Sequence, residues 1–519
     1  MLQQAREAVA LAQDLFAQAV AHIQADGPDS QPDQARLYQL SHTAASLAMC
    51  ETALEYGSKG TIEERLAHIF IGKALHEFAA IVWAAHERWG ISGDALDGVR
   101  GYCSITTQGD FIAEAANRPG PGHLGDDLTM VAEIFRRFAD EQIMPVAEAI
   151  HRHDDDIPQD LIDGVAALGC FGLSINQQYG GSASGGEDDY LAMVIATEEL
   201  SRGSLGAGGS LITRPEILAR ALEAGGTDAQ KIKWLPKLAS GESLCAVAVT
   251  EPDFGSDVAS LSVTATPTDG GWLLNGTKTW CTFAGRATVL MVLARTNNDA
   301  SVGHRGLSLL LVEKPADLGH TFHHELDGAT MGGRAIPTLG YRGMHSFEVV
   351  FDNWFVPDAN LVGEDAGLGR GFYLQMAGFE NGRLQTTARS VGVMQRAYEL
   401  AVIYAADRQV FGSSLDTYQL TNVKLGTMAA LIQISRQFSY RVARQMATGE
   451  GAADAAMAKA FVCKAAEWVA REAMQIHGGY GYAEEYEVSR LYVDARVLSI
   501  FEGADEVLCL KLIARRLLA

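Results

Sequence analysis

Hydrophobic periodicity changes twice along this 519-residue chain, and the change limits the fold more than any other feature. Apolar residues recur at helical spacing in the first quarter of the chain, for example from Val9 to Ile23. The pattern changes from Ser243 to about Pro357, where short apolar runs are typical of antiparallel strands. We interpret the Asp-Gly-Gly and Asn-Gly sequences between these runs as turns. Long helical patterns then return at about 370–410, 416–448 and 452–476 and suit a helical bundle. The order predicts an α+β protein that is mostly α.

One segment marks a domain boundary near the N-terminus. Asn117-Arg-Pro-Gly-Pro-Gly122 contains two prolines and two glycines, which cannot continue a helix. The chain also exceeds the size at which a single hydrophobic core stops growing. We therefore predict four parts. They are a helical extension at 1–117, a helical domain at 126–242, a β domain at 243–360 and a C-terminal helical bundle at 361–519.

The charge and the cysteines restrict partners and location. Asp and Glu outnumber Lys and Arg by 64 to 41, and the net charge of −23 would repel a phosphate backbone or an anionic membrane surface. The seven cysteines show no Cys-x-x-Cys spacing, which fits free thiols in a reducing compartment. No signal-peptide pattern and no apolar run of about 18 residues is present. We expect a cytoplasmic protein with no nucleic-acid partner and no membrane insertion.

Two pairs of motifs point to one family. Val249-Thr-Glu-Pro-Asp-Phe-Gly-Ser-Asp257 precedes Asn275-Gly-Thr-Lys-Thr-Trp-Cys-Thr282 at a spacing suited to a β-hairpin. Near the end, Gln475-Ile-His-Gly-Gly-Tyr-Gly-Tyr482 precedes Ile500-Phe-Glu-Gly-Ala-Asp-Glu506. From about Asp126 onward the chain thereby resembles acyl-CoA dehydrogenases, flavoproteins that remove two hydrogens from the α and β carbons of an acyl thioester. The resemblance implies their fold, a helical domain, an antiparallel β domain and a C-terminal bundle, here with an extra N-terminal helical domain.

The resemblance also implies FAD as the cofactor. A nicotinamide site lacks support, because Gly367-Leu-Gly-Arg-Gly371 has neither the Gly-x-Gly-x-x-Gly spacing nor a preceding parallel strand. The residues that match the flavin-ring positions are Val249, Thr250, Trp280 and Thr282, although an isolated Trp280 would read as an ordinary strand aromatic. The residues that match contacts to the pyrophosphate and adenine of a partner subunit's FAD are Arg408, Phe411, Gln419, Gln475 and Gly479. The protein is thus expected to be a homo-oligomer, either a dimer or a tetramer.

Glu502 is the candidate catalytic base. In the family, a glutamate here takes the α-proton while the β-hydrogen leaves as hydride to flavin N5, and burial strengthens a carboxylate as a base. Outside this context, Glu502 would read as a helix N-terminal carboxylate stabilised by the helix dipole. A subgroup places its base at the position of Gly382, where glycine cannot serve. Ala504 stands where the family often has threonine, so one contact to flavin or substrate is lost or replaced.

The resemblance implies three substrate contacts. Ser256 matches a position that contacts the CoA portion, Arg383 matches an arginine near the CoA arm, and Gly503 follows the candidate base. Arg383 could equally be an ion-pair partner of Glu380 on the same helix.

The extension and the segment 331–344 resemble a branch of the family that oxidises (2S)-methylsuccinyl-CoA to mesaconyl-CoA in the ethylmalonyl-CoA pathway. Such a substrate carries a carboxylate on its β-carbon, so the pocket should offer an arginine. The candidates are Arg214, Arg334 and Arg342, each of which could instead be a surface or interdomain residue. The alternatives are a dehydrogenase for another short or branched acyl-CoA, an acyl-CoA oxidase and a non-catalytic flavin-binding scaffold. An electron-transfer flavoprotein is the implied electron acceptor.

Two features carry no chemical assignment. The cluster His151-Arg-His-Asp-Asp-Asp156 lacks a second group of ligands at a recognisable spacing, so we predict no metal site. The N-terminal extension has no chemistry of its own in the sequence. We hypothesise that it packs on the body and helps to close the acyl pocket or a subunit interface.

Overall fold

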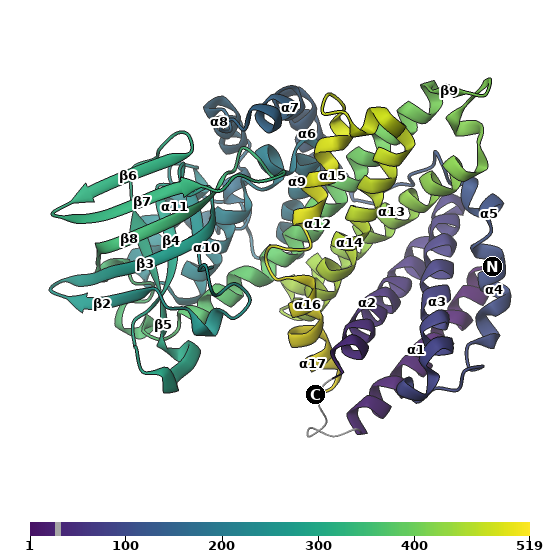
Figure 1. Ribbon diagram of the computed structural model, residues 1–519, viewed down its shortest axis with the longest axis horizontal. Coiled ribbons are helices and arrows are strands. Elements are labelled where there is room, and N and C mark those ends of the chain that lie inside the picture. The colour runs from purple at the N-terminus through teal and green to yellow at the C-terminus, as the bar shows by residue number, and fades with distance from the viewer. Residues whose placement is uncertain (26–32) are drawn as a thin grey trace. The chain divides into compact units, whose positions relative to one another are not determined.

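The computed structural model describes residues 1–25 and 33–519. The chain forms two compact units (Figure 1). Unit 1 contains residues 1–129 and 386–519, and unit 2 contains residues 130–385. The prediction of a mostly helical α+β protein with an extra N-terminal helical region is confirmed.

Unit 1 is almost entirely helical. Its N-terminal helices are α1 (Leu2–Ala25), α2 (Gln34–Gly57), α3 (Thr61–Trp89), α4 (Arg100–Thr106) and α5 (Gly109–Ala113). Its C-terminal helices are the second half of α12 (Gly371–Asp407), α13 (Gln419–Ala447), α14 (Ala452–His477), α15 (Glu487–Val497), α16 (Asp505–Val507) and α17 (Ala514–Leu517), with the short strands β9 (Gln409–Val410) and β10 (Ser413–Ser414) after α12. Residues 118–125, which include both prolines of the predicted boundary, have no regular secondary structure.

Helix α2 lies inside this unit rather than on its surface. It packs against α1, α3, α13 and α14, so two helices of the extension and two of the C-terminal bundle surround it (Figure 1). Buried residues such as Leu40, Leu47 and Tyr56 face several directions around its axis, as expected for a core helix. The N-terminal helices and the C-terminal bundle therefore share one folded body.

Helix α3 is the described helix whose length and composition would suit a membrane span. Its most apolar window is 61% buried inside the protein. A core helix of a globular protein satisfies the same test, and α3 packs against α1, α2 and α13.

Unit 2 combines helices with one large sheet. The helices are α6 (Asp126–Phe138), which begins in unit 1, α7 (Met144–His153), α8 (Gln159–Ala167), α9 (Glu187–Gly203), α10 (Thr213–Gly225), α11 (Asp228–Ala239) and the first half of α12. The strands are β1 (Cys245–Ala248), β2 (Thr264–Thr268), β3 (Gly271–Thr282), β4 (Val289–Arg295), β5 (Leu307–Glu313), β6 (Thr321–Leu326), β7 (Ala329–Ala335) and β8 (Ser346–Pro357).

The sheet runs in the order β1-β4-β2-β3-β8-β7-β6, with β5 on β4. The hairpins β2–β3, β4–β5 and β6–β7 are antiparallel, as the sequence predicts. The prediction is wrong for β1, which pairs with β4 in parallel, and for β2, which touches β4 in parallel. The hairpin β2–β3 lies between β1 and β4 in the chain, and a connection of this length allows the return in the same direction.

The Asn275-Gly276 pair was also misread as a turn. It lies inside β3, at an irregularity in the register between β3 and β8. Gly276 has a φ of 125°, a backbone conformation that residues with a side chain rarely adopt. The Asn275 side chain accepts a hydrogen bond from the backbone N–H of Asn353 at 2.9 Å. The glycine thus permits a β-bulge, while the turn before β3 uses Gly270 instead.

Candidate active site

Glu502 lies in unit 1, in the turn between α15 and α16. Its φ is 56° and that of Gly503 is 103°, so two consecutive residues have left-handed backbone. For a residue with a side chain this conformation costs about 1–2 kcal/mol. Such strain persists where the surroundings fix it, and it is common at functional sites.

Helix α12 supplies the partners of the Glu502 carboxylate. The Nη2 atom of Arg389 lies 2.8 Å from both carboxylate oxygens, and the Thr386 hydroxyl donates to one of them at 2.5 Å. The Arg389 side chain is completely buried and that of Glu502 is 7% exposed. The Arg389 guanidinium also lies 4.8 Å from the centre of the Phe501 ring. The candidate base is thus held in a nearly dry ion pair.

A buried lysine fixes the backbone on either side of Glu502. Lys459 on α14 donates from Nζ to the carbonyl of Leu498 at 3.1 Å and to that of Gly503 at 2.8 Å. Burial lowers the pKa of Lys459. The two carbonyls are the ends of the segment that carries Glu502, so this side chain closes the turn.

Arg389 is not among the site residues predicted from the sequence. A signal was present, because an arginine stands among Thr387, Ala388 and Val391 on a helix expected to be buried. A buried arginine requires a partner. The sequence did not show that its partner is Glu502, which lies 113 residues away.

The four candidate flavin-ring residues lie in unit 2. Val249 and Thr250 follow β1, whereas Trp280 and Thr282 end β3. The Thr279 N–H donates to the Thr250 carbonyl at 2.8 Å, which brings the two motifs together. Trp280 is 55% exposed. An exposed flat indole beside backbone groups and the Thr282 hydroxyl, which is 2.9 Å from Ser346 Oγ, fits a planar heteroaromatic ring with polar edges.

A buried ion pair holds the same two motifs. Lys278 Nζ donates to Glu251 at 2.8 Å and to the Val249 carbonyl at 2.9 Å. Both charged side chains are at most 2% exposed. Burial raises the pKa of Glu251, but Lys278 and Ser262 outweigh it, and the pKa stays below its usual value.

We expect Lys278→Met to destabilise the protein by about 3–5 kcal/mol, because Glu251 would remain buried without its counter-charge. Urea unfolding followed by circular dichroism measures the change. Lys233→Met is the matched control, since Lys233 and Glu313 form a 2.7 Å pair with side chains 46% and 52% exposed. The control should lose less than about 1 kcal/mol. Equal losses in both variants would contradict the role of the buried pair.

The candidate dinucleotide residues lie in unit 1. Phe411 is 99% exposed, and the Arg408 guanidinium lies 5.9 Å from the Tyr480 ring. Gln475 is exposed at the end of α14, and a β-carbon added to Gly479 would meet no atom within 4 Å. These residues present a cation, exposed aromatic surface and open backbone, which fit a pyrophosphate and an adenine. Gln419 differs, because its side chain donates to Asp110 of α5.

The other candidate residues occupy varied places. Ser256 is exposed in the loop after β1, Arg383 is 9% exposed on the unit 2 part of α12, and Gly503 adjoins Glu502. Of the three arginines considered for a substrate carboxylate, Arg214 is buried on α10, Arg334 is exposed on β7, and Arg342 donates to the carbonyls of Thr338 and His151.

Two clusters among the described residues could offer three metal ligands each. They are Asp154, His320 and His345 in unit 2, and His42, Asp505 and Cys509 in unit 1. The first supplies the second group of ligands that the sequence did not reveal beside Asp154. Each cluster already contains a cation, because Arg342 lies 3.7 Å from Asp154 and Lys464 lies 4.0 Å from Asp505. A metal ion would be repelled there, so we describe both clusters as ion-pair networks.

Comparison with known families identifies the chain's relatives. Three family models match, for the acyl-CoA dehydrogenase N-terminal domain at residues 125–242, the middle domain at 246–354 and the C-terminal domain at 369–518. The chain belongs to the acyl-CoA dehydrogenase family. Its members are FAD-dependent oxidoreductases, so the family resemblance, the enzyme class and the cofactor predicted from the sequence are confirmed.

Individual acyl-CoA dehydrogenases agree with this assignment. The chain is 43% identical over 400 residues to (2S)-methylsuccinyl-CoA dehydrogenase of Cereibacter sphaeroides, across 77% of this chain and 71% of that protein. Butyryl-CoA dehydrogenase from Megasphaera elsdenii superposes with a TM-score of 0.70 at 30% identity, across 76% of this chain and 99% of the other. A glutaryl-coenzyme A dehydrogenase in complex with glutaryl-CoA superposes with a TM-score of 0.68 at 31% identity, across 76% and 95%.

Proposed function

We propose that this acyl-CoA dehydrogenase oxidises a short branched dicarboxylic acyl-CoA, and specifically (2S)-methylsuccinyl-CoA to mesaconyl-CoA. The observation that carries the proposal is the buried Arg389 guanidinium, 2.8 Å from the Glu502 carboxylate. The 43% identity to a methylsuccinyl-CoA dehydrogenase supports it independently.

Glu502 takes the α-proton. Its carboxylate is nearly buried, which favours proton uptake from a weak carbon acid. In the substrate-free protein, both of its oxygens contact donors from Arg389 and Thr386, so it must turn away from at least one of them to accept a proton. Bound FAD supplies the acceptor for the β-hydrogen, which leaves as hydride.

Arg389 explains why a dicarboxylic substrate can approach this base. In (2S)-methylsuccinyl-CoA the free carboxylate is bonded to the β-carbon, next to the α-carbon that loses its proton. Two carboxylates at such a separation repel each other strongly in a dry site. A guanidinium has five donors in a planar fork and can bind both anions at once. Arg389 thus serves as the counter-charge for the substrate carboxylate as well as for Glu502.

We also propose FAD contacts and partners from the family resemblance. Val249, Thr250, Trp280 and Thr282 contact the flavin, and Ser256, Arg383 and Gly503 contact the CoA thioester. Phe411, Tyr480 and Tyr482 are respectively 99%, 49% and 85% exposed, and a second subunit would cover such an apolar surface. We therefore propose a homo-oligomer, with the adenylate of FAD bound across subunits at Arg408, Gln419, Gln475 and Gly479. An electron-transfer flavoprotein is the proposed electron acceptor.

A cytoplasmic location is proposed from the cysteines. All seven are free and buried. Free thiols persist in a reducing compartment.

Anaerobic bleaching of the flavin absorbance tests the proposed function. The panel contains (2S)-methylsuccinyl-CoA, 2-methylbutyryl-CoA, glutaryl-CoA and butyryl-CoA. The second has a methyl group in place of the free carboxylate. Fast bleaching by methylsuccinyl-CoA with slow bleaching by 2-methylbutyryl-CoA is the expected result. Faster bleaching by butyryl-CoA or 2-methylbutyryl-CoA, which have no free carboxylate, would contradict the proposed substrate but not the enzyme class. Rapid reoxidation in air without an electron-transfer protein would instead indicate an oxidase.

A further inference from the structure

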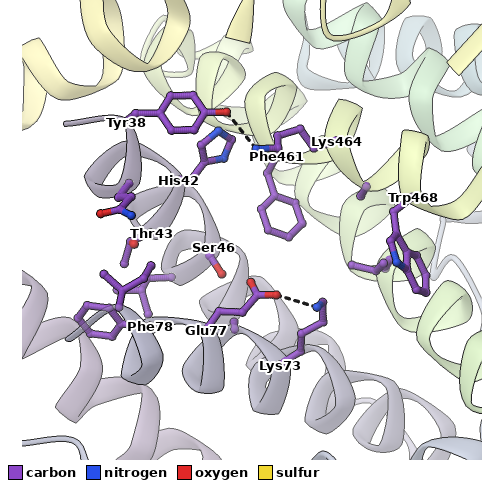
Figure 2. Close-up of a pocket in the computed structure, with 16 residues that line it drawn as sticks. Tyr38, His42, Thr43, Ser46, Lys73, Glu77, Phe78, Phe461, Lys464 and Trp468 are labelled. Atoms are coloured by element: carbon purple, nitrogen blue, oxygen red, sulfur yellow. Dashed lines mark hydrogen bonds and ion pairs between the residues drawn. The ribbon is translucent and has the colours of Figure 1, made fainter. Parts of the chain in front are cut away.

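A buried polar cluster connects the N-terminal extension with the segment that follows Glu502. Asp505 is 7% exposed, and its Oδ2 atom accepts hydrogen bonds from the Tyr38 hydroxyl and from His42 Nε2, the latter at 3.1 Å. Lys464 on α14 donates to the Tyr38 hydroxyl at 3.0 Å, and Figure 2 shows this contact with the His42 ring beside Tyr38. Tyr38 and His42 lie on α2, one turn apart. The extension therefore reaches within three residues of the candidate base.

Side chains from other helices hold the short segment from Glu502 to Asp505 in place. Glu502 and Gly503 are both left-handed, and α16 starts at Asp505. Arg389 and Lys459 hold its first half through the Glu502 carboxylate and the Gly503 carbonyl. Helix α2 holds the end of the segment through Asp505, and Ser41 of α2 donates a buried hydrogen bond of 2.8 Å to the carbonyl of Cys509, four residues further along.

The protonation states of Asp505 and Tyr38 favour the hydrogen bond between them. Burial raises the pKa of Asp505, but the hydrogen bonds and charge of His42 and the hydrogen bond of Tyr38 outweigh it and keep the pKa below its usual value. Burial and Asp505 together raise the pKa of Tyr38, so its phenol keeps the proton that it donates. Asp505 thus remains a carboxylate that accepts from two donors of α2.

Both apolar packing and hydrogen bonds connect α2 with this segment, because Ala44 of α2 packs in one hydrophobic core with Leu508 and Cys509. A cavity of about 390 Å³ adjoins the cluster, lined in part by His42, Phe78, Phe461 and Trp468 (Figure 2). Side chains across a cavity make fewer contacts than side chains in a close-packed core. The hydrogen bonds to Asp505 are the contacts of α2 that lie nearest to Glu502 in the chain.

We propose that Tyr38 and His42 are positioning residues, which fix the orientation of the catalytic base through Asp505. The inference rests on the proposed function in that Glu502 is the base. It gives the N-terminal extension a role in the reaction, because a displacement of about 1 Å at a catalytic group can cost about a hundredfold in rate.

The test compares the holoenzymes of Tyr38→Phe, His42→Ala and the double variant, with His42→Gln as a conservative rescue. Glu51→Gln is the matched control, because Glu51 also lies on α2 and bonds Arg441 of α13 at 3.0 Å, away from Asp505. Two quantities are measured, namely kcat and KM with methylsuccinyl-CoA, and amide hydrogen exchange of residues 499–510 in the substrate-free protein.

We expect kcat of the double variant to fall about ten- to a hundredfold with little change in KM. The amide hydrogens of residues 499–510 should exchange faster in the double variant than in Glu51→Gln. His42→Gln should recover part of the loss. Unchanged exchange in the double variant, or losses equal to those of Glu51→Gln, would overturn the proposal. If the wild type oxidises no acyl-CoA, the proposed function fails, while the exchange measurement still decides whether α2 holds the segment.

Discussion

Replacing Glu502 with glutamine is expected to slow flavin reduction by about 10²- to 10⁴-fold, the usual contribution of a general base. Glutamine keeps the size of the side chain and an oxygen that can accept from Arg389 or Thr386, so the turn should remain folded. It cannot take the α-proton. Stopped-flow measurement of anaerobic bleaching by methylsuccinyl-CoA gives the rate of this step, and FAD content and melting temperature report on folding.

Glu506→Gln is the control for this variant. Glu506 is an exposed carboxylate four residues further along the same segment, and its loss changes the local charge by the same amount. It should reduce its flavin at close to the wild-type rate. A Glu502→Gln enzyme that is bleached as fast as Glu506→Gln would remove Glu502 from the role of base.

The helices and the family could be predicted from the sequence because their signals are local. Apolar spacing predicted a helix at 452–476, and α14 spans Ala452–His477. The motifs around Val249 and Glu502 are short runs of adjacent residues, and they were sufficient to identify the family that the comparisons confirm. The assignments of individual site residues by the same resemblance stay predictions.

The errors concern contacts between residues distant in the chain. Asn275-Gly276 has the composition of a turn, and only its pairing with Asn353 shows that it forms a bulge in β3. The parallel pairing of β1 with β4 likewise depends on the route of the intervening chain. The contact of the Gln419 side chain with Asp110, 309 residues away, was likewise not visible in the sequence, and the assignment of Gln419 to the cofactor stays a prediction. Sequence patterns describe a residue's neighbours in the chain and not its neighbours in space.

For the same reason, the sequence did not show that Arg389 lies next to the candidate base. Arg214, Arg334 and Arg342 were considered for a substrate carboxylate because a pocket for an anionic substrate should offer an arginine, and the sequence alone does not choose among them. Arg389 has the stronger physical case, because its side chain is completely buried and it contacts the Glu502 carboxylate. A buried charge is costly unless it is paired, and a guanidinium with five donors can pair with a second anion as well as with the candidate base.

Replacing Arg389 with methionine is expected to reverse the substrate preference. Loss of one partner of a buried charge pair costs about 2–5 kcal/mol, which corresponds to roughly 30- to 5,000-fold in kcat/KM for methylsuccinyl-CoA. The isosteric substrate 2-methylbutyryl-CoA has no carboxylate to lose, so its kcat/KM should fall much less. Arg389→Lys should lie between the two, because lysine keeps the charge but lacks the planar fork. Steady-state kinetics with both substrates gives the ratio.

Arg396→Met separates this effect from a general disturbance of α12. Arg396 lies on the same helix and bonds Glu487 at 2.7 Å, and its side chain is 19% exposed. Its replacement should leave the ratio of the kcat/KM values for the two substrates unchanged. If Arg389→Met slows both substrates equally, Arg389 acts only by holding Glu502, and the substrate carboxylate binds elsewhere. If the ratio shifts toward 2-methylbutyryl-CoA, one buried guanidinium both restrains the base and selects a substrate that brings its own anion.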